Sequence, residues 1–161
     1  MGVSGSGKTT VGEPLAERLG VDFGEADDFH PRANKDKMSA GIPLDDNDRT
    51  PWLHAVGVWL AEHQGTGAVA TCSALKRTYR ELLRAEAPGT VFLHLAAPPD
   101  LLSERMTTRK GHFMPPSLLT SQLDTLQPLD PDEDGLEVDS SAAPDEIVER
   151  FLTWWGEKET P

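Results

Sequence analysis

The first nine residues of the chain hold a complete phosphate-binding loop motif. Residues 2–9 read G-V-S-G-S-G-K-T, which fits G-x-x-x-x-G-K-S/T at every fixed position. Glycines in such a loop let backbone N–H groups turn toward phosphate oxygens, and the next helix directs its positive end at the anion. We expect Lys8 to reach the β- and γ-phosphates and Thr9 to ligate Mg²⁺. The residues expected to hold ATP here are Gly2, Ser4, Gly5, Ser6, Gly7, Lys8, Thr9 and Thr10.

A loop of this kind normally follows a buried β-strand, whereas only Met1 precedes Gly2 in this sequence. The first strand of the fold is therefore predicted to be missing. Without a central strand, two strand edges would be exposed and a layer of the core would be lost. Two explanations stay open: the start of the chain is placed too late, which we favour, or the chain lacks the strand.

Short apolar runs alternate with helical patterns along the rest of the chain. Strands are predicted at Val21–Gly24, Ala68–Cys72, Val91–Leu95 and Leu136–Val138. Helices are predicted over Lys8–Leu19, Arg77–Glu86, Asp100–Arg109 and Ser117–Thr125, with two more beginning at Thr50 (as N-cap before Pro51) and at Pro144. This alternation predicts one α/β domain over residues 1–161, with a parallel sheet covered on both faces.

The composition excludes several classes of function. The formal net charge is −12, from 15 basic and 27 acidic residues, which argues against binding nucleic acid or an anionic membrane. A single cysteine rules out an internal disulfide framework, and the sequence has no run of 18 apolar residues. These features favour the cytoplasm. The basic residues gather in a few segments, which suits a cleft that attracts a small anion or simply solvated helix faces.

Two carboxylates follow the first predicted strand, at Glu25 and Asp27. At the carboxyl end of a strand they can face one crevice, where open α/β sheets bind ligands. Phosphoryl transfer needs a carboxylate that orients or deprotonates the attacking hydroxyl, and Asp27 is our candidate for that role. Glu25 is the candidate to hold Mg²⁺, through water. On spacing alone, the same residues could be an acidic loop that caps the next helix.

Several further segments carry a family resemblance. They are ADDFHP at 26–31, N-x-x-K-M at 34–38, G-I-P-L-D-D-x-D-R-x-P-W-L at 41–53, CSALK at 72–76, YR at 79–80 and RKGHFMP at 109–115. With the phosphate-binding loop, they resemble gluconokinase, a small P-loop sugar-acid kinase related to the shikimate kinases. The resemblance implies a three-layer P-loop kinase fold with a parallel sheet of order 2-3-1-4-5, and often a homodimer. It also implies ATP-dependent phosphorylation of D-gluconate at O6 to give 6-phosphogluconate.

Two other functions remain open from the sequence. The first is an N-terminally truncated nucleotide-binding module without kinase activity, which the missing strand suggests. The second is a related small-molecule kinase, such as a shikimate kinase, which would place different acceptor-binding residues on the same frame.

Site residues follow from the resemblance by position. Asp27 matches the acidic residue that contacts the acceptor hydroxyl, and the expected catalytic set is Lys8, Asp27 and Arg109. The expected substrate-binding residues are Asp27, His30, Arg49, Ser73, Lys76, Arg80, His112 and Gln122. Arg105 and Arg109 are expected to reach ATP from a lid at about residues 105–115. Family members commonly have an acidic residue near position 127, where this chain has Gln127.

The charged residues in this set could instead have no functional role, as surface salt bridges or solvated charges. The guanidinium of Arg49 suits a carboxylate ligand, and the alternative is a salt bridge with a neighbouring aspartate at position 45, 46 or 48. Lys76 and Arg80 are four residues apart, so both can lie on one helix face, either as ligands or as solvated charge.

Overall fold

The computed structural model describes residues 1–108 and 116–160. In chain order its elements are α1 (Lys8–Leu19), β1 (Asp22–Glu25), the 3₁₀ helix η1 (Ala26–Phe29), α2 (Arg32–Ser39), α3 (Asp46–Glu62), β2 (Ala68–Thr71), α4 (Arg77–Glu86), β3 (Phe92–Ala96), α5 (Pro99–Thr108), α6 (Pro116–Thr125), β4 (Gly135–Asp139) and α7 (Pro144–Glu159). The four strands lie within one residue, at each end, of the positions predicted from the sequence.

The strands form two parallel pairs rather than one continuous sheet. β1 pairs with β2, with Asp22 opposite Ala68, and β3 pairs with β4, with Phe92 opposite Gly135. These pairs are what the order 2-3-1-4-5 leaves when strand 1 is removed. The prediction of a parallel sheet that lacks its first strand is therefore confirmed.

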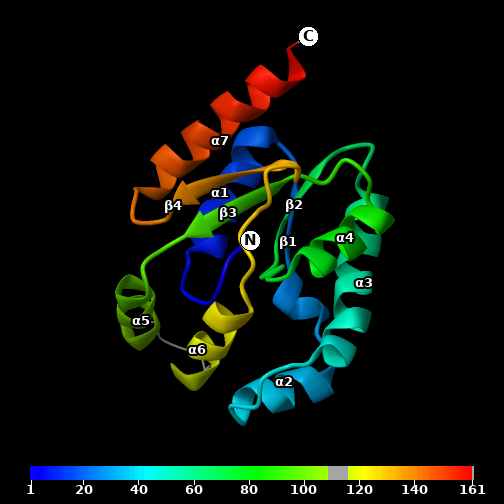
Figure 1. Cartoon of the computed structure of the whole chain (residues 1–161). Helices are drawn as coiled ribbons and strands as arrows, with labels where there is room; N and C mark the ends of the chain where they lie inside the picture. Colours follow the sequence, from blue (N-terminus) through cyan, green and yellow to red (C-terminus); the bar gives the residue numbers. More distant parts are fainter. Residues whose placement is uncertain (109–115, 161) are drawn as a thin grey trace.

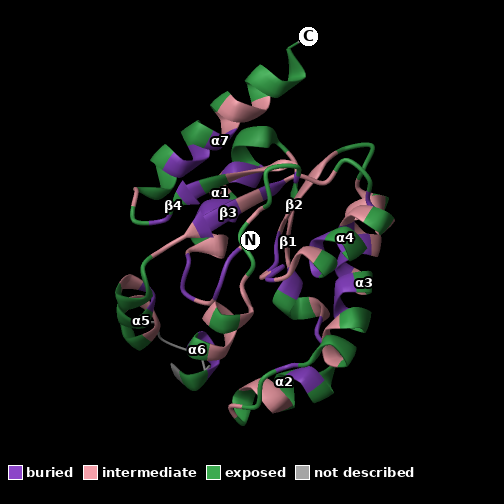
Figure 2. Cartoon of the chain, in the orientation of Figure 1, coloured by how far each residue is buried: buried purple, intermediate pink, exposed green. Residues whose placement is uncertain are grey.

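Helices cover both faces of the strands (Figure 1). α1 and α7 lie against one face, where Val11, Leu15, Ile147, Val148 and Phe151 form a buried cluster. α3 and α4 lie against the other face, where a second cluster includes Leu53, Val56, Leu75 and Leu83. Figure 2 shows the buried residues concentrated along the helix faces that meet the strands. The remaining helices, α2, α5 and α6, lie beyond the strands and frame the end where the site is found.

The predicted start of α3 at Thr50 is wrong. The helix begins at Asp46, because Asp45 and Asp48 form a capping box in which each side chain accepts the other residue's backbone N–H. Thr50 lies within the helix, and its hydroxyl donates to the carbonyl of Asp46 at 2.8 Å. Pro51 therefore occupies a later turn than the first helical position.

The short helix α2 was not predicted from the sequence. Its eight residues, RANKDKMS, have no apolar periodicity, and its buried residue is the polar Asn34. The predicted helices α1 and α4 match at both ends, and α5 and α6 match to within one residue over the described part. No helix in residues 1–108 or 116–160 is long and apolar enough to cross a membrane.

Candidate active site

A small pocket lies where the phosphate-binding loop meets η1, α3 and α6. Its volume is about 60 Å³. The predicted site residues that line it are Ser4, Lys8, Asp27, His30, Arg49, Ser73 and Gln122. These residues come from five segments of the sequence and face one space. Lys76 and Arg80 do not line it, and the predicted Arg109 and His112 lie outside the described residues.

The loop that precedes α1 has the geometry of an anion site. Gly5 and Gly7 have φ angles of +81° and +97°, which residues with a Cβ rarely adopt. α1 has no acidic residue in its first turn, so nothing there opposes a phosphate at its positive end. The buried hydroxyl of Ser6 has no hydrogen-bond partner among the described residues. A phosphate oxygen would satisfy that hydroxyl, so the loop fits the triphosphate of ATP.

Lys8 reaches back over this loop. Its ammonium group donates to the carbonyls of Gly2, at 3.0 Å, and of Val3, at 3.1 Å. These bonds hold the charge above the loop and beside the pocket. The ammonium group is therefore already in position for a bound phosphate. Lysine suits this role because it offers a compact positive charge to phosphate oxygens.

Thr9 and Glu25 form a candidate metal site. The hydroxyl of Thr9 donates to one oxygen of the Glu25 carboxylate at 2.5 Å, and the hydroxyl of Thr71 donates to the other at 2.7 Å. One carboxylate, one hydroxyl and phosphate oxygens suit Mg²⁺, which usually keeps several of its waters. No group of three or more potential metal-ligating acidic, histidine or cysteine side chains occurs in the described parts of the chain. A metal here would therefore depend on nucleotide oxygens.

Thr71 was not predicted as a site residue. It is the last residue of β2 and its side chain is buried beside Glu25, the last residue of β1. A polar residue at the carboxyl end of a parallel strand was the available signal, since ligands bind at that edge.

Asp27 and His30 stand on the acceptor side of the pocket. The indole N–H of Trp52 donates to the carbonyl of Ala26 at 2.6 Å and so fixes η1, which carries Asp27. The Asp27 residue is exposed and lines the pocket. His30 is buried and stacks on Trp52, with ring centroids 4.1 Å apart. The carboxylate and the imidazole therefore share one rigid wall.

Asn34 sets the tautomer of His30. Its side-chain amide donates to the carbonyl of Asp48 at 2.8 Å and lies 3.2 Å from Nδ1 of His30. As the donor, this amide leaves Nδ1 as acceptor, so the ring carries its proton on Nε2. Burial lowers the pKa of His30 to about 4, so the ring is neutral at physiological pH. His30 is thus prepared to donate one hydrogen bond.

Arg49 lies at the pocket wall in a network with Tyr79. Its Nη1 donates to the phenol oxygen of Tyr79 at 3.0 Å, and that phenol donates to the carboxylate of Asp46. Lys76 pairs with the same carboxylate at 3.2 Å. The hydrogen bonds from Tyr79 and Lys76 lower the pKa of Asp46. Arg49 therefore donates a hydrogen bond to a phenol and does not form the salt bridge with a neighbouring aspartate that the sequence left open.

Arg80 is not placed in the pocket. Its side chain is fully buried, and its Nε and Nη2 donate to both oxygens of Glu133 at 2.7 and 2.8 Å. Its Nη1 donates to the carbonyls of Ala74, at 2.9 Å, and Gln127, at 3.0 Å. Lys76 and Arg80 were expected to lie on one helix face. They do not, because Lys76 is the N-cap of α4 and precedes its first helical residue. The donors of the Arg80 guanidinium are therefore taken up by protein groups away from the pocket.

Arg105 connects the phosphate-binding loop to the turn after β4. It donates to the carbonyls of Gly5 and Ser6, each at 3.3 Å, and to the carbonyl of Ser140 at 2.6 Å. On another side of the loop, the carbonyl oxygen of the Gln122 side chain accepts the N–H of Ser4 at 2.7 Å. The positions of α5 and α6 are thus tied to the loop that would hold ATP.

Comparison with known proteins identifies the family of this chain. The family model described as shikimate kinase matches residues 4–154. A gluconokinase of Gluconobacter oxydans is 50% identical over 154 residues, covering 94% of this chain and 86% of that protein. The chain belongs to the gluconokinase family. The resemblance predicted from the sequence is therefore confirmed, and the chain is a phosphotransferase of a family that uses ATP with a metal ion.

Two solved structures of similar proteins have the same fold. An unliganded sugar kinase from Janibacter sp. HTCC2649 is 49% identical, with a TM-score of 0.92, over 97% of this chain and 91% of that one. A gluconokinase from Sinorhizobium meliloti 1021 is 50% identical, with a TM-score of 0.83, over 95% and 87%. The α/β P-loop kinase fold is thus shared with proteins of closely similar sequence.

Proposed function

We propose that this gluconokinase-family chain transfers the γ-phosphoryl group of ATP to O6 of D-gluconate, giving 6-phosphogluconate and ADP. The observation that carries the proposal is the convergence of Lys8, Asp27 and Arg49 on one pocket. Phosphoryl transfer needs a cation at the phosphate, a carboxylate at the attacking hydroxyl and a grip on the rest of the acceptor. Each residue supplies one of these requirements.

Asp27 is the proposed partner of the acceptor hydroxyl. It orients the O6 hydroxyl and accepts its proton as O6 bonds to the γ-phosphorus and the bond to the leaving ADP oxygen breaks. Lys8 stabilises the negative charge on the phosphate oxygens. Thr9 and Glu25 would hold Mg²⁺, which when bound neutralises charge on the β- and γ-phosphates. Arg105, and Arg109 outside the described residues, complete the proposed nucleotide contacts.

Different residues are proposed to bind the carboxylate and the polyol of gluconate. Arg49 offers a planar donor pair that matches the gluconate carboxylate. His30, through its Nε2 proton, with Ser73 and Gln122, supplies hydrogen bonds to the polyol. Lys76 acts by holding Asp46, which in turn accepts from Tyr79. Arg80 is left out of the proposed substrate site because its donors are already occupied.

The wider proposal is one catalytic domain over residues 1–161 that works in the cytoplasm, with a lid at residues 105–115 that includes His112. Support from the described residues is limited to Arg105 on α5, which donates to the carbonyls of Gly5 and Ser6 in the phosphate-binding loop, and residues 109–115 lie outside the described residues. A homodimer is proposed from the resemblance alone.

The direct test is ATP-dependent ADP release by the purified chain with D-gluconate, beside shikimate, D-glucose and no acceptor. We expect turnover with gluconate far above the other three. Equal ADP release with and without gluconate would reject the proposed acceptor.

Replacing Tyr79 with phenylalanine is expected to weaken gluconate binding without weakening ATP binding. The change removes the phenol that accepts from Arg49 and donates to Asp46, so the guanidinium loses its orientation. One lost hydrogen bond of about 1 kcal/mol corresponds to a roughly fivefold higher KM for gluconate. Steady-state kinetics in both substrates measures the effect, with Thr78→Ala, an exposed neighbour on α4, as the control. An equal rise in the KM for ATP would contradict this role.

A further inference from the structure

The Glu25 carboxylate is held by two hydroxyl groups from different parts of the fold. Thr9, in the first turn of α1, donates to one oxygen at 2.5 Å, and Thr71, the last residue of β2, donates to the other at 2.7 Å. Because each oxygen has its own donor, the carboxylate cannot rotate without losing a hydrogen bond. Thr9 and Glu25 are the residues proposed to hold Mg²⁺, whereas Thr71 has no part in that proposal.

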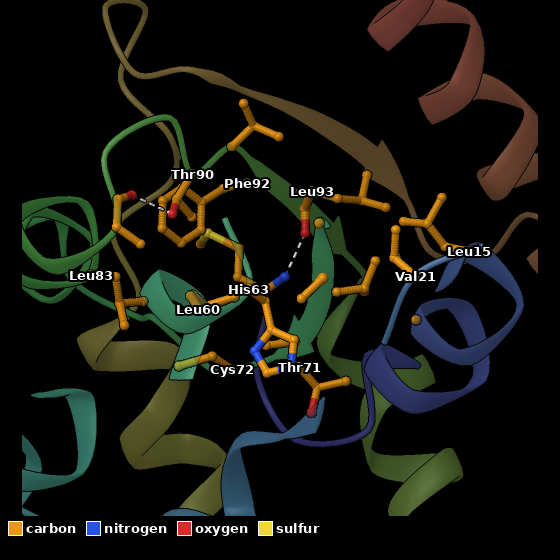
Figure 3. Close-up of a pocket in the computed structure, with 18 of the residues that line it drawn as sticks. Leu15, Val21, Leu60, His63, Thr71, Cys72, Leu83, Thr90, Phe92 and Leu93 are labelled. Carbon is orange, nitrogen blue, oxygen red and sulfur yellow. Dashed lines mark hydrogen bonds between the residues drawn. The ribbon is translucent and has the colours of Figure 1, made fainter. Parts of the chain in front are cut away.

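The hydroxyl of Thr71 is an exception on its strand. The other three residues of β2, Ala68, Val69 and Ala70, are apolar. The strand borders a cavity of about 540 Å³ with a mainly apolar lining, and Figure 3 shows the Thr71 side chain among the residues around it. A buried hydroxyl in such surroundings is unfavourable unless it is hydrogen-bonded, and valine has nearly the same shape without that need. Packing alone therefore gives no reason for a hydroxyl at position 71.

The Thr71 side chain is itself fixed in place. The residue stands directly opposite Glu25 in the register of β1 and β2, and it is only 5% exposed. A Cβ added at Gly12 of α1 would lie 3.4 Å from the Thr71 methyl group, so this methyl packs closely on the helix. Branching at Cβ allows few rotamers, so the packing of the methyl also fixes the direction of the hydroxyl. The Thr71 hydroxyl is thus a rigid support for the carboxylate.

The bond from Thr9 to Glu25 decides what the Thr9 hydroxyl can offer a cation. A hydroxyl has one proton and two lone pairs. With its proton directed at Glu25, the Thr9 oxygen keeps its lone pairs for a metal ion. A carboxylate that turned away would release this proton, and the hydroxyl could then direct its positive end at the cation. The support that Thr71 gives to Glu25 therefore extends to Thr9.

We propose that Thr71 is a positioning residue for the Mg²⁺ ion that accompanies ATP, and that it acts through Glu25 on Thr9. The inference rests on the metal site of the proposed function. Replacing a group that orients the ligands of a metal usually weakens metal binding by about 10–100-fold. Thr71 should accordingly set how strongly Mg²⁺ improves nucleotide binding, and it should have no effect on the binding of metal-free nucleotide.

The test measures the binding of a non-hydrolysable ATP analogue by calorimetry, with excess Mg²⁺ and with EDTA. The Kd in EDTA divided by the Kd in Mg²⁺ gives the gain in affinity due to the metal. Thr71→Val removes the hydroxyl and keeps the methyl on Gly12, whereas Thr71→Ser keeps the hydroxyl. We expect Thr71→Val to lower the gain about tenfold and to change the Kd in EDTA by less than about twofold. Thr71→Ser should keep most of the gain, and Thr71→Ala, a second variant without the hydroxyl, should lose it as Thr71→Val does.

A double-variant cycle tests the route through Glu25. Glu25→Ala removes the carboxylate, and Thr9 with the phosphate oxygens should retain part of the gain. Adding Thr71→Val to Glu25→Ala should then lower the gain no further, because the hydroxyl has no carboxylate to hold. The affinity of Mn²⁺ for the chain with bound ADP, followed by electron paramagnetic resonance, should change in the same pattern. These readouts need neither an acceptor nor turnover.

Three results would overturn the proposal. The first is a gain in Thr71→Val equal to that of the parent. The second is an equal loss of nucleotide affinity with Mg²⁺ and with EDTA, which would leave Thr71 a structural role only. The third is a further loss of the gain when Thr71→Val is added to Glu25→Ala. A parent that binds the analogue equally with and without Mg²⁺ would reject the proposed metal site and this inference together, while the gluconate assay tests the proposed reaction separately.

Discussion

Replacing Asp27 with asparagine is expected to lower kcat for gluconate phosphorylation by about 10²–10⁴-fold. The amide keeps the size of the side chain but cannot accept the proton of the attacking hydroxyl. Asp27 stands on η1, which Trp52 anchors from the core, so the substitution should leave the pocket wall in place. Initial-rate measurements at saturating ATP and gluconate give kcat directly.

The matched control for this prediction is Asp28→Asn. Asp28 is the next residue of η1, it is also exposed, and it does not line the pocket. Its substitution removes the same charge from the same helix and should change kcat by less than about twofold. ATP affinity, followed by calorimetry, should be unchanged in both variants. A similar loss of kcat in both would show that local charge matters, and not the carboxylate at position 27.

Replacing Arg80 with leucine is expected to destabilise the protein by about 3–5 kcal/mol, the usual effect of removing one partner of a buried ion pair. For a chain of this length, that lowers Tm by about 10 °C. The leucine leaves the buried Glu133 carboxylate without the donors at 2.7 and 2.8 Å, and it frees the carbonyls of Ala74 and Gln127. Under conditions where the variant is folded, its KM for gluconate should match the parent, because Arg80 does not line the pocket.

The control for Arg80→Leu is Glu81→Gln, which removes an exposed pair with Arg77 on the same helix. Exposed pairs contribute little, so we expect a change below about 1 kcal/mol. A raised KM for gluconate in folded Arg80→Leu would return Arg80 to the substrate site and contradict its structural assignment.

The same ion pair should appear in the pH dependence of stability. Hydrogen bonds from Arg80 lower the pKa of Glu133 to about 2, from an ordinary value of 4.5. The unfolded chain therefore binds this proton at higher pH than the folded one, so the contribution is present above pH 4.5 and is lost as the pH falls toward 2. Between pH 4.5 and 2, the Tm of the parent should fall more steeply with decreasing pH than the Tm of Arg80→Leu.

The phosphate-binding loop and the positions of the strands were predictable because each depends on local signals. Glycines at fixed spacing, followed at once by Lys8 and a helix, determine the loop almost alone. Short apolar runs located the strands, and their pairing followed from the family order. α2 escaped prediction because its buried residue, Asn34, is polar and acts through hydrogen bonds to His30 and Asp48.

Arg80 shows the limit of spacing arguments. Its spacing of four residues from Lys76 in the sequence suggested a shared helix face. The position of the Arg80 side chain is instead set by its ion pair with Glu133, which lies more than fifty residues later in an acidic segment. Nothing in that segment distinguishes Glu133 from the exposed Asp130 and Asp132 near it. Which carboxylate is buried depends on tertiary packing, since each sequence neighbour offers the same charge.

The position of Trp52 bears on how acceptor preference could change through evolution. The same indole ring is a core residue of α3, holds the carbonyl of Ala26 and stacks on His30. A substitution of Trp52 cannot reshape the acceptor pocket without also destabilising the fold. Such a variant would be less abundant in the cell, so selection for a new sugar acid would act against it. Ser73 and Gln122 line the same pocket from less buried positions. Laboratory evolution toward other polyol acids should therefore accumulate its first changes at those two residues and retain the tryptophan.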